Sequence, residues 1–245
     1  MSAGLVSTGD VDFDQMATTK LAIAPSNNNT LYATLPHNTL QGVFKWDDAL
    51  AIWTQLAGLE GAAGSSDIRL YKCIETYPTS ASRLYLGTYF HGIWISNDDG
   101  ENWSPASTGE GADISEQSVQ EIEVLDDGTV WAAAADGVYS STDHGVTFLR
   151  ATPPSSRFGE SSVEYFSDIE FNPDNKDEIF ASTTKAYPVY ENSGSIWHSV
   201  DGGSSWREVA KDLLMKRVNA LAFHDGFLYM GTEGANVLRM KIAGD

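Results

Sequence analysis

The sequence predicts an all-β fold, a β-propeller of five four-stranded blades in which the N-terminus completes the last blade. Three observations lead to this prediction. An eight-residue motif recurs along the chain, strand-like apolar segments recur at a similar spacing, and helical periodicity is almost absent over the 245 residues. Repeats of about 40–50 residues that contain strands instead of helices are typical of propeller blades.

The recurring motif has Ser at its first position, Asp at its third, Gly at its fifth and an aromatic residue at its eighth. It occurs as SNDDGENW (96–103), STDHGVTF (141–148) and SVDGGSSW (199–206). A worn fourth copy, WDDALAIW at 46–53, keeps Asp48 and Trp53 but has lost the Ser and the Gly. The aspartates of the four copies lie 50, 45 and 58 residues apart, which is the length of one blade.

Five apolar segments resemble one another and are expected to form the second strand of each blade. Their leading apolar residues lie 53, 46, 49 and 49 positions apart, so the sequence predicts five units. Alternating aliphatic and aromatic residues between Gly, Asn and Asp turns are the usual signature of strands. The segments are TLYAT (30–34), RLYLGT (83–88), TVWAA (129–133), EIFAST (178–183) and FLYMGT (227–232).

Each unit is expected to run through an inner strand, the second strand, a third strand, the motif turn and a fourth strand. The fifth unit ends after three strands, and SAGLVSTGD (2–10) resembles NWSPASTGE (102–110), which follows a motif copy. We therefore expect residues 2–8 to supply the missing strand, because an open sheet edge is normally closed. A short helix is expected only at 209–218. The whole chain, 1–245, is then one domain with blades at 18–59, 66–108, 117–151, 165–210 and 216–245 plus 2–8.

Every member of the motif has a structural use in a hairpin, so the motif is interpreted as a turn and not as a binding site. The Asp carboxylate can accept hydrogen bonds from backbone N–H groups of its own turn. The Gly allows a backbone conformation that costs other residues energy, and the aromatic ring buries a large apolar area. The residues assigned this structural role are Ser96, Asp98, Gly100, Trp103, Ser141, Asp143, Gly145, Phe148, Ser199, Asp201, Gly203 and Trp206.

The pattern Ser-x-Asp-x-Gly-x-x-Trp between the last two strands of a blade resembles the Asp-box, or bacterial neuraminidase repeat. The segment 167–209 resembles the whole-blade pattern of that family. The resemblance implies a propeller fold for nearly the full chain. It leaves the function open, because similar blades occur in sialidases, xyloglucanases, sortilin-type receptors and photosystem II assembly factors. It also implies that binding or chemistry takes place on the loop face opposite the motif turns.

Composition excludes several classes of partner. The net charge is −19, from 34 acidic and 15 basic residues, so neither nucleic acid nor an anionic membrane surface is an expected partner. The single Cys73 and five scattered histidines form no metal-ligand pattern, and no cofactor motif is present, so neither a metal nor a cofactor is expected. No signal peptide is visible, and the compartment is left open: it is extracellular if the chain is a mature or excised piece.

The candidate binding residues lie in loops on the face opposite the motif turns. The longest second-to-third-strand loop, 184–195, combines aromatic and charged side chains of the kind found in recognition loops. The loop TYFHG (88–92) and the connection 153–165 are its expected neighbours. The candidates are Lys185, Tyr187, Tyr190, Glu191, Tyr89, His91, Arg157 and Glu160.

Two classes of function are compatible with these observations. The favoured one is a non-catalytic binding module or assembly scaffold that holds a protein or a glycan, either as a monomer or within a larger assembly. The alternative is a xyloglucanase-like or sialidase-like glycoside hydrolase. For that alternative Asp136 and Glu233 are the candidate carboxylates, because both follow second strands. The sequence contexts of this pair match that family poorly, so enzymatic activity is not favoured.

Overall fold

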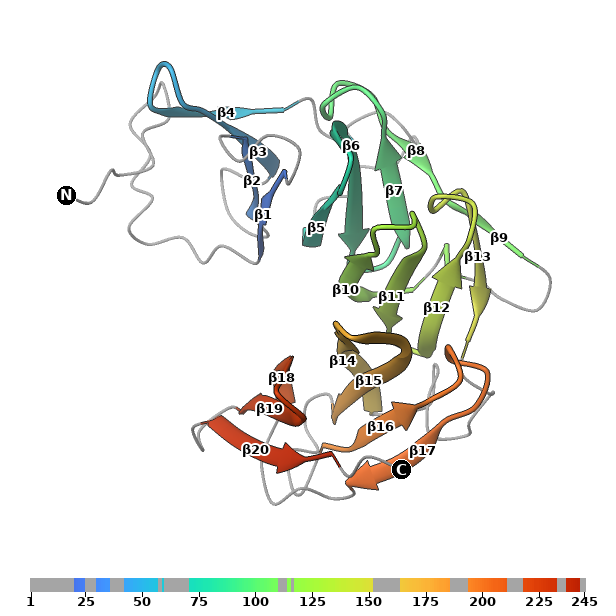
Figure 1. The fold of residues 1–245 in the computed structure, drawn as a ribbon. Helices are drawn as coiled ribbons and strands as arrows, with labels where there is room; N and C mark the ends of the chain where they lie inside the picture. Colours follow the sequence, from blue (N-terminus) through green and yellow to red (C-terminus); the bar gives the residue numbers. More distant parts are fainter. Residues whose placement is uncertain are drawn as a thin grey trace. The chain divides into compact units, whose positions relative to one another are not determined.

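The computed structural model describes residues 20–24, 30–35, 42–56, 59, 71–109, 114–115, 117–151, 164–185, 194–210, 218–232 and 237–242, without the side chains of 81, 164 and 185. The regular elements in this part of the chain are strands (Figure 1). They are β1 (Lys20–Ile23), β2 (Leu31–Leu35), β3 (Gly42–Asp47), β4 (Ile52–Gln55), β5 (Tyr71–Tyr77), β6 (Ser80–Thr88), β7 (Ile93–Ser96), β8 (Ser104–Pro105), β9 (Ser107–Thr108), β10 (Val119–Val124), β11 (Val130–Ala134), β12 (Gly137–Ser141), β13 (Thr147–Arg150), β14 (Glu164–Asn172), β15 (Asn175–Lys185), β16 (Ile196–Ser199), β17 (Arg207–Ala210), β18 (Val218–His224), β19 (Phe227–Thr232) and β20 (Val237–Lys241).

The strands form sheets in which, apart from β9, consecutive strands are neighbours. Their orders are β1-β2-β3-β4, β5-β6-β7-β8, β10-β11-β12-β13-β9, β14-β15-β16-β17 and β18-β19-β20. In the first sheet, for example, antiparallel registers pair Ala22 with Tyr32 and Tyr32 with Lys45. The all-β prediction is confirmed, since each expected second strand overlaps a strand of the structure: β2, β6, β11, β15 and β19.

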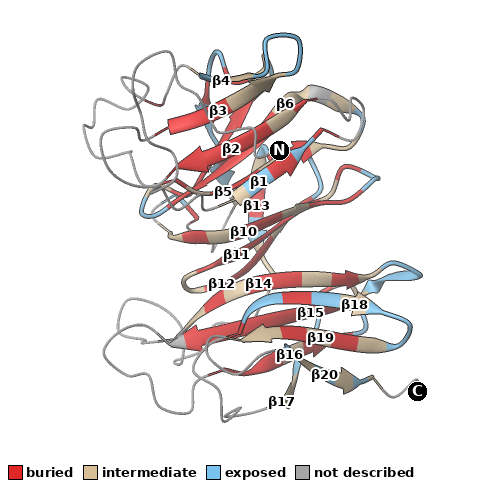
Figure 2. Ribbon diagram, turned by 90° about the vertical axis from the view of Figure 1, so that its left-hand side faces the viewer, coloured by how far each residue is buried: buried red, intermediate tan, exposed pale blue. Residues whose placement is uncertain are grey.

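Two of the second strands, β2 and β11, are buried along almost their whole length, which explains why they appear in the sequence as continuous apolar runs. All five residues of β11 are buried, and four of the five residues of β2 are buried (Figure 2). A strand that is covered on both faces loses the alternation of apolar and polar residues that a half-exposed strand keeps. The fourth strands are more exposed, as in β4 and β17, where no residue is fully buried.

A short parallel strand follows the first intact motif. After β8 the chain forms β9, which pairs in parallel with β13 and so belongs to the next sheet. Ser107 donates its backbone N–H to Val146 at 2.7 Å, and Gly109 donates to Phe148 at 2.9 Å. These bonds cover an outer strand that would otherwise present unpaired backbone groups. The sequence analysis did not predict this strand.

The chain divides into two compact units. The first contains Met1–Val130 and Ser141–Phe148, and the second contains Trp131–Ser140 and Leu149–Asp245. The core of the first includes Tyr32, Ile74, Leu84, Trp94 and Trp103. The core of the second includes Phe180, Ile196, Val218, Leu228 and Met230. That residues 1–245 form one domain stays a prediction.

Two further expectations concern the ends of elements. Residues 2–8, expected to complete the last sheet, lie outside the described residues, and three strands of that sheet are described. The helix expected at 209–218 is wrong at both ends, because Val209 and Ala210 belong to β17 and Val218 begins β18. These apolar side chains pack in the core of the second unit, and such burial overrides helix propensity. Residues 211–217 lie outside the described part.

Candidate functional site

The three intact motif turns share one hydrogen-bond pattern. In each turn the Ser hydroxyl donates to the Asp Oδ1 at 2.7–2.8 Å and accepts the Gly N–H at 2.8–2.9 Å. The same Asp Oδ1 accepts the N–H of the residue four positions further on, at 2.7–2.8 Å. The carboxylates of Asp98, Asp143 and Asp201 are thus engaged within their own turns.

These bonds favour the ionised carboxylate. Hydrogen bonds from the side chain and backbone of Asn102 hold the pKa of Asp98 below its usual value, and Ser205 does the same for Asp201. For Asp143, burial acts to raise the pKa, but hydrogen bonds from Ser141 and Thr147 together lower it. A carboxylate that accepts hydrogen bonds within its own turn in this way stabilises that turn.

The glycines of the motif also determine how the turn packs. Each follows a residue in the left-handed region (Asp99, His144 and Gly202, with φ of 62°, 60° and 64°). A Cβ added to Gly145 would lie 2.5 Å from the ring of Tyr85, and one added to Gly203 would lie 2.6 Å from Trp131. Both rings come from the preceding second strand, β6 or β11. The motif turn is therefore a packing surface for the neighbouring sheet, which the sequence analysis did not anticipate.

At the opposite end of the second sheet, the β6–β7 loop presents two exposed aromatic rings. Tyr89 is 37% exposed and Phe90 is 58% exposed. Their ring centroids lie 4.3 Å apart at 81°, an edge-to-face pair. The ammonium of Lys72, on β5, lies 4.5 Å from the centre of the Tyr89 ring. Of the predicted binding residues, Tyr89 belongs to this exposed group and His91 lies in the same loop, and the structure adds Phe90 and Lys72 beside Tyr89.

A network of hydrogen bonds holds this loop in place. The hydroxyl of Thr88 donates to the carbonyl of Gly92 and accepts the N–H of His91, both at 2.9 Å. The indole of Trp94 donates to the carbonyl of His91 at 3.0 Å. Gly92 has a φ of +62°, where a Cβ would collide with the carbonyl of Ile114. The loop is thus an ordered platform, which lowers the entropic cost of binding through it.

The other predicted binding residues cannot be placed. Tyr187, Tyr190, Glu191, Arg157 and Glu160 lie outside the described residues, and of Lys185 only the backbone is described. The same holds for Glu233, one of the two candidate catalytic carboxylates. Their assignment stays a prediction.

The other candidate catalytic carboxylate, Asp136, has close partners on its own sheet. The Tyr139 hydroxyl lies 2.8 Å and 2.9 Å from its two carboxylate oxygens. Arg150 Nη1 lies 3.2 Å from Oδ2, in an ion pair whose side chains are 18% and 14% exposed. A carboxylate held by a tyrosine hydroxyl and an arginine is well suited to fix the β11–β12 turn against β13.

Sequence reasoning missed a set of buried and partly buried ionisable groups on the inner strands β1, β5 and β10. Lys20 donates to Glu121 across the first unit. Burial raises the pKa of Glu75 to about 7, and burial also raises the pKa of Glu121, although Lys20 opposes this. Burial raises the pKa of the Cys73 thiol as well. The available signal was the presence of glutamates, Glu75 and Glu121, between apolar residues in the two strands YKCIETY and VQEIEV.

Metal ligation and membrane spanning have no support in the described part of the chain. Within it, no group of three or more His, Cys, Asp or Glu side chains is arranged to hold a metal ion. The buried His198 faces Glu178 through Nε2 at 2.9 Å and receives a hydrogen bond from Arg207 at Nδ1, so it is held by protein groups. No described helix is long and apolar enough to cross a membrane.

Comparisons with known proteins give matches at the level of structure alone. No protein-family model matches the chain, and no curated protein matches it. A GH74 xyloglucanase from Xanthomonas campestris matches with a TM-score of 0.66 and 16% identity, over 93% of this chain and 36% of the enzyme. YCF48 from Cyanidioschyzon merolae matches with a TM-score of 0.65 and 12% identity, over 94% of this chain and 69% of that protein.

A third match is the extracellular domain of a hybrid two-component system from B. thetaiotaomicron, with a TM-score of 0.67 and 9% identity. This match covers 95% of this chain and 28% of the two-component chain. The chain therefore spans only about a third of the xyloglucanase and less of the two-component protein. Identities this low show the fold alone. Together with the sheets of sequential strands described above, these structural matches define the protein as a repeat protein of the all-β class. More specifically, it has a β-propeller fold.

Proposed function

We propose that this chain is a non-catalytic binding module or assembly scaffold that holds a protein or glycan partner at the loop end of its sheets, opposite the motif turns. The observation that carries the proposal is the ordered, exposed pair Tyr89–Phe90 beside Lys72. Rigid aromatic side chains with a polar or charged neighbour are enriched among residues that dominate binding energy. The fold is compatible with this role but does not select it, because propellers of both catalytic and non-catalytic kinds resemble the chain.

We propose further that the long loop 184–195 belongs to the same surface. Its residues Tyr187, Tyr190 and Glu191, together with Arg157 and Glu160, come from connections that follow second strands or join units. We also propose that the motif turns are Asp-boxes of the bacterial neuraminidase repeat. The support for this assignment is the hydrogen-bond pattern that the three turns share.

The experiment uses the intact chain as bait against protein extract and against an array of neutral and sialylated glycans. Tyr89→Ser with Phe90→Ser is expected to reduce binding at least tenfold, because two exposed rings leave the contact. The matched control is Val200→Asn, which removes an exposed apolar side chain from a motif turn where the other copies carry Asn97 and Thr142. A second pair, Tyr187→Ala with Tyr190→Ala, tests the long loop. Equal binding by the parent and both double variants, with unchanged melting temperatures, would reject this surface.

The alternative, a glycoside hydrolase, has one observation in its favour, the structural match to a xyloglucanase. The contacts of Asp136 with Tyr139 and Arg150 weigh against it. We expect no hydrolysis of xyloglucan, β-glucan or sialosides, measured as the release of reducing ends or free sialic acid. Turnover that Asp136→Asn abolishes, while the fold is intact, would overturn the binding proposal in favour of the enzyme.

A further inference from the structure

The worn motif at 46–53 forms a turn that differs from the three intact ones. Trp46 stands in place of the Ser and Leu50 in place of the Gly. The turn is capped instead by Asp47, whose Oδ1 accepts the N–H groups of Ala49 and Leu50, both at 3.0 Å. Asp48 therefore does not make the Ser–Asp–backbone contacts of its counterparts, and among the described residues it accepts one hydrogen bond, from the Trp46 indole at 3.4 Å.

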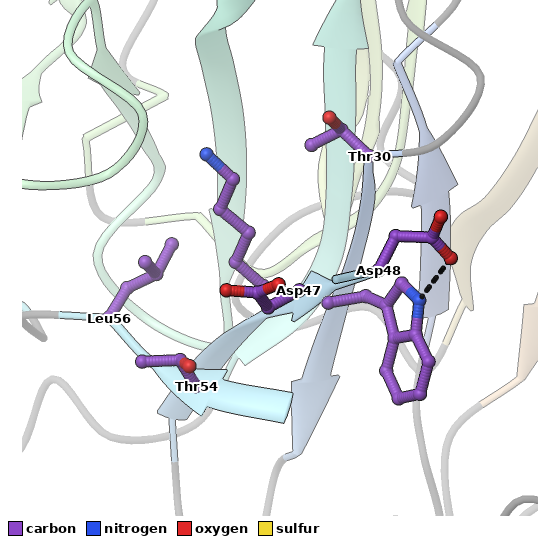
Figure 3. Close-up of a pocket in the computed structure, with 7 residues that line it drawn as sticks. Thr30, Asp47, Asp48, Thr54 and Leu56 are labelled. Carbon is purple, nitrogen blue, oxygen red and sulfur yellow. Dashed lines mark hydrogen bonds between the residues drawn. The ribbon is translucent and has the colours of Figure 1, made fainter. Parts of the chain in front are cut away.

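A pocket lies beside this turn. Its volume is about 420 Å³, within the range of about 300–1,000 Å³ that is typical of ligand sites. Figure 3 shows that the side chains of Asp47, the last residue of β3, and Asp48 extend to different sides: Asp47 lies toward Leu56 and Thr54, and Asp48 points away from them. Lys45 and Trp46 also line the pocket. The rings of Trp46 and Trp53 pack together at a centroid distance of 5.6 Å. The described lining thus combines two carboxylates with the side chain of one tryptophan, Trp46.

The charges of the pocket are unbalanced. Lys45, the lysine among the described lining residues, pairs with the adjacent motif turn: its Nζ lies 2.9 Å from Asp99 Oδ2. The Tyr32 hydroxyl donates to Asp99 Oδ1. Neither Asp47 nor Asp48 forms an ion pair with another described residue. Among the described residues, the pocket therefore carries two carboxylates that no lysine, arginine or histidine pairs with, in a chain whose net charge is −19.

We propose that this pocket binds the guanidinium group of an arginine from a basic peptide. A guanidinium matches a carboxylate in charge and in donor geometry, and it also stacks on indole rings. The negative field of the whole chain attracts such a ligand during encounter. A neutral sugar could use the hydroxyl and indole groups but would leave the two negative charges uncompensated, so the cationic ligand is favoured.

The site is distinct from the proposed loop surface. It lies at the β3–β4 turn, the motif end of the first sheet, whereas Tyr89 and Phe90 lie at the β6–β7 loop, the opposite end of the second sheet. Failure of one site therefore leaves the other untouched, and the variants of the two experiments share no residue.

The test measures the binding of a fluorescein-labelled, end-blocked Gly-Ser peptide that contains two arginines, by anisotropy with the full chain. Asp47→Asn with Asp48→Asn is expected to weaken binding at least tenfold, as is replacement of the arginines by uncharged citrulline. Raising NaCl from 50 to 500 mM is expected to weaken it as well. Asp126→Asn with Asp174→Asn removes two exposed carboxylates elsewhere and is expected to change the affinity less than twofold.

In the Asp47→Asn variant the new side chain keeps an oxygen that can cap the turn. Asp48→Asn is also measured alone. The melting temperature of each variant separates a folding defect from a loss of binding. The proposal is overturned if the citrulline peptide binds equally well, if the two double variants weaken binding equally, or if no arginine peptide binds at millimolar concentration. Binding of a neutral oligosaccharide that Asp48→Asn abolishes, without peptide binding, would also overturn it in favour of a sugar site.

Discussion

At the scale of single residues, the motif is best understood as a set of contacts between neighbouring sheets. The Ser and Asp close the turn on itself, while the Gly leaves room for a side chain of the preceding sheet. The Tyr85 hydroxyl donates to the His144 carbonyl at 2.9 Å, and burial raises the pKa of that hydroxyl to about 12. The residue before the glycine also reaches the preceding sheet, since His144 Nδ1 lies 3.1 Å from the Tyr77 hydroxyl.

This packing predicts unequal costs for two chemically identical substitutions. Gly145→Ala is expected to destabilise the protein by about 2–4 kcal/mol, because it combines a left-handed backbone with a clash against Tyr85. Gly226→Ala has a similar φ of +73° but meets nothing within 4 Å, so about 1 kcal/mol is expected from backbone strain alone. Urea unfolding of both variants measures the difference. Equal losses would mean that the glycine serves the backbone conformation only.

At the scale of elements, the inner strands carry buried charge that makes stability depend on pH. Glu75 on β5 is surrounded by Glu121 of β10, Lys20 of β1, and Cys73 and Thr76 of its own strand. The folded-state pKa of Glu75, about 7, lies above its ordinary value of 4.5, so the folded protein binds this proton more tightly than the unfolded chain does. The corresponding stability is fully present below about pH 4.5 and is lost as the pH rises through about 7.

We therefore expect the melting temperature to be higher at pH 5 than at pH 8, by an amount that corresponds to at most about 3 kcal/mol from Glu75. Glu75→Gln is expected to flatten this dependence, whereas Glu101→Gln, at an exposed turn position, is expected to leave it unchanged. The motif aspartates act in the opposite direction. Their pKa values are lowered, so their contribution disappears only in acid below the ordinary value of 3.8. A melting temperature that does not change between pH 5 and pH 8 would contradict the assignment for Glu75.

At the scale of the whole molecule, the open question is how the repeat is completed. The last sheet has three described strands, and residues 1–19 lie outside the described part. The sequence predicts that residues 2–8 supply the fourth strand, because SAGLVSTGD repeats the pattern that follows a motif. If residues 2–8 complete the sheet β18-β19-β20, the folding of that sheet depends on a segment from the opposite terminus of the chain.

Deletion of residues 1–9 tests this prediction. We expect a loss of several degrees in melting temperature and concentration-dependent aggregation, because an uncovered strand edge pairs with other molecules. Light scattering and thermal unfolding of the truncated and full chains measure both effects. A matched control variant carries residues 2–8 in a scrambled order with unchanged composition. If the order of residues in the strand matters, this variant is expected to lose melting temperature and to aggregate as the deletion variant does. An unchanged melting temperature and a monomeric truncated chain would show that the strand is not required.

The sequence alone determined the fold class and the position of each second strand, since these depend on a local pattern that recurs with a similar spacing. The motif turns could be assigned a structural use for the same reason, because Ser, Asp and Gly satisfy each other within eight residues. Only the tertiary structure revealed the rest. That Gly145 faces Tyr85, that Lys20 meets Glu121, that β9 joins the next sheet, and that the worn motif borders a pocket with two carboxylates all depend on contacts between residues distant in sequence. Such contacts have no local signature, because a side chain's partner is decided by how whole strands are placed.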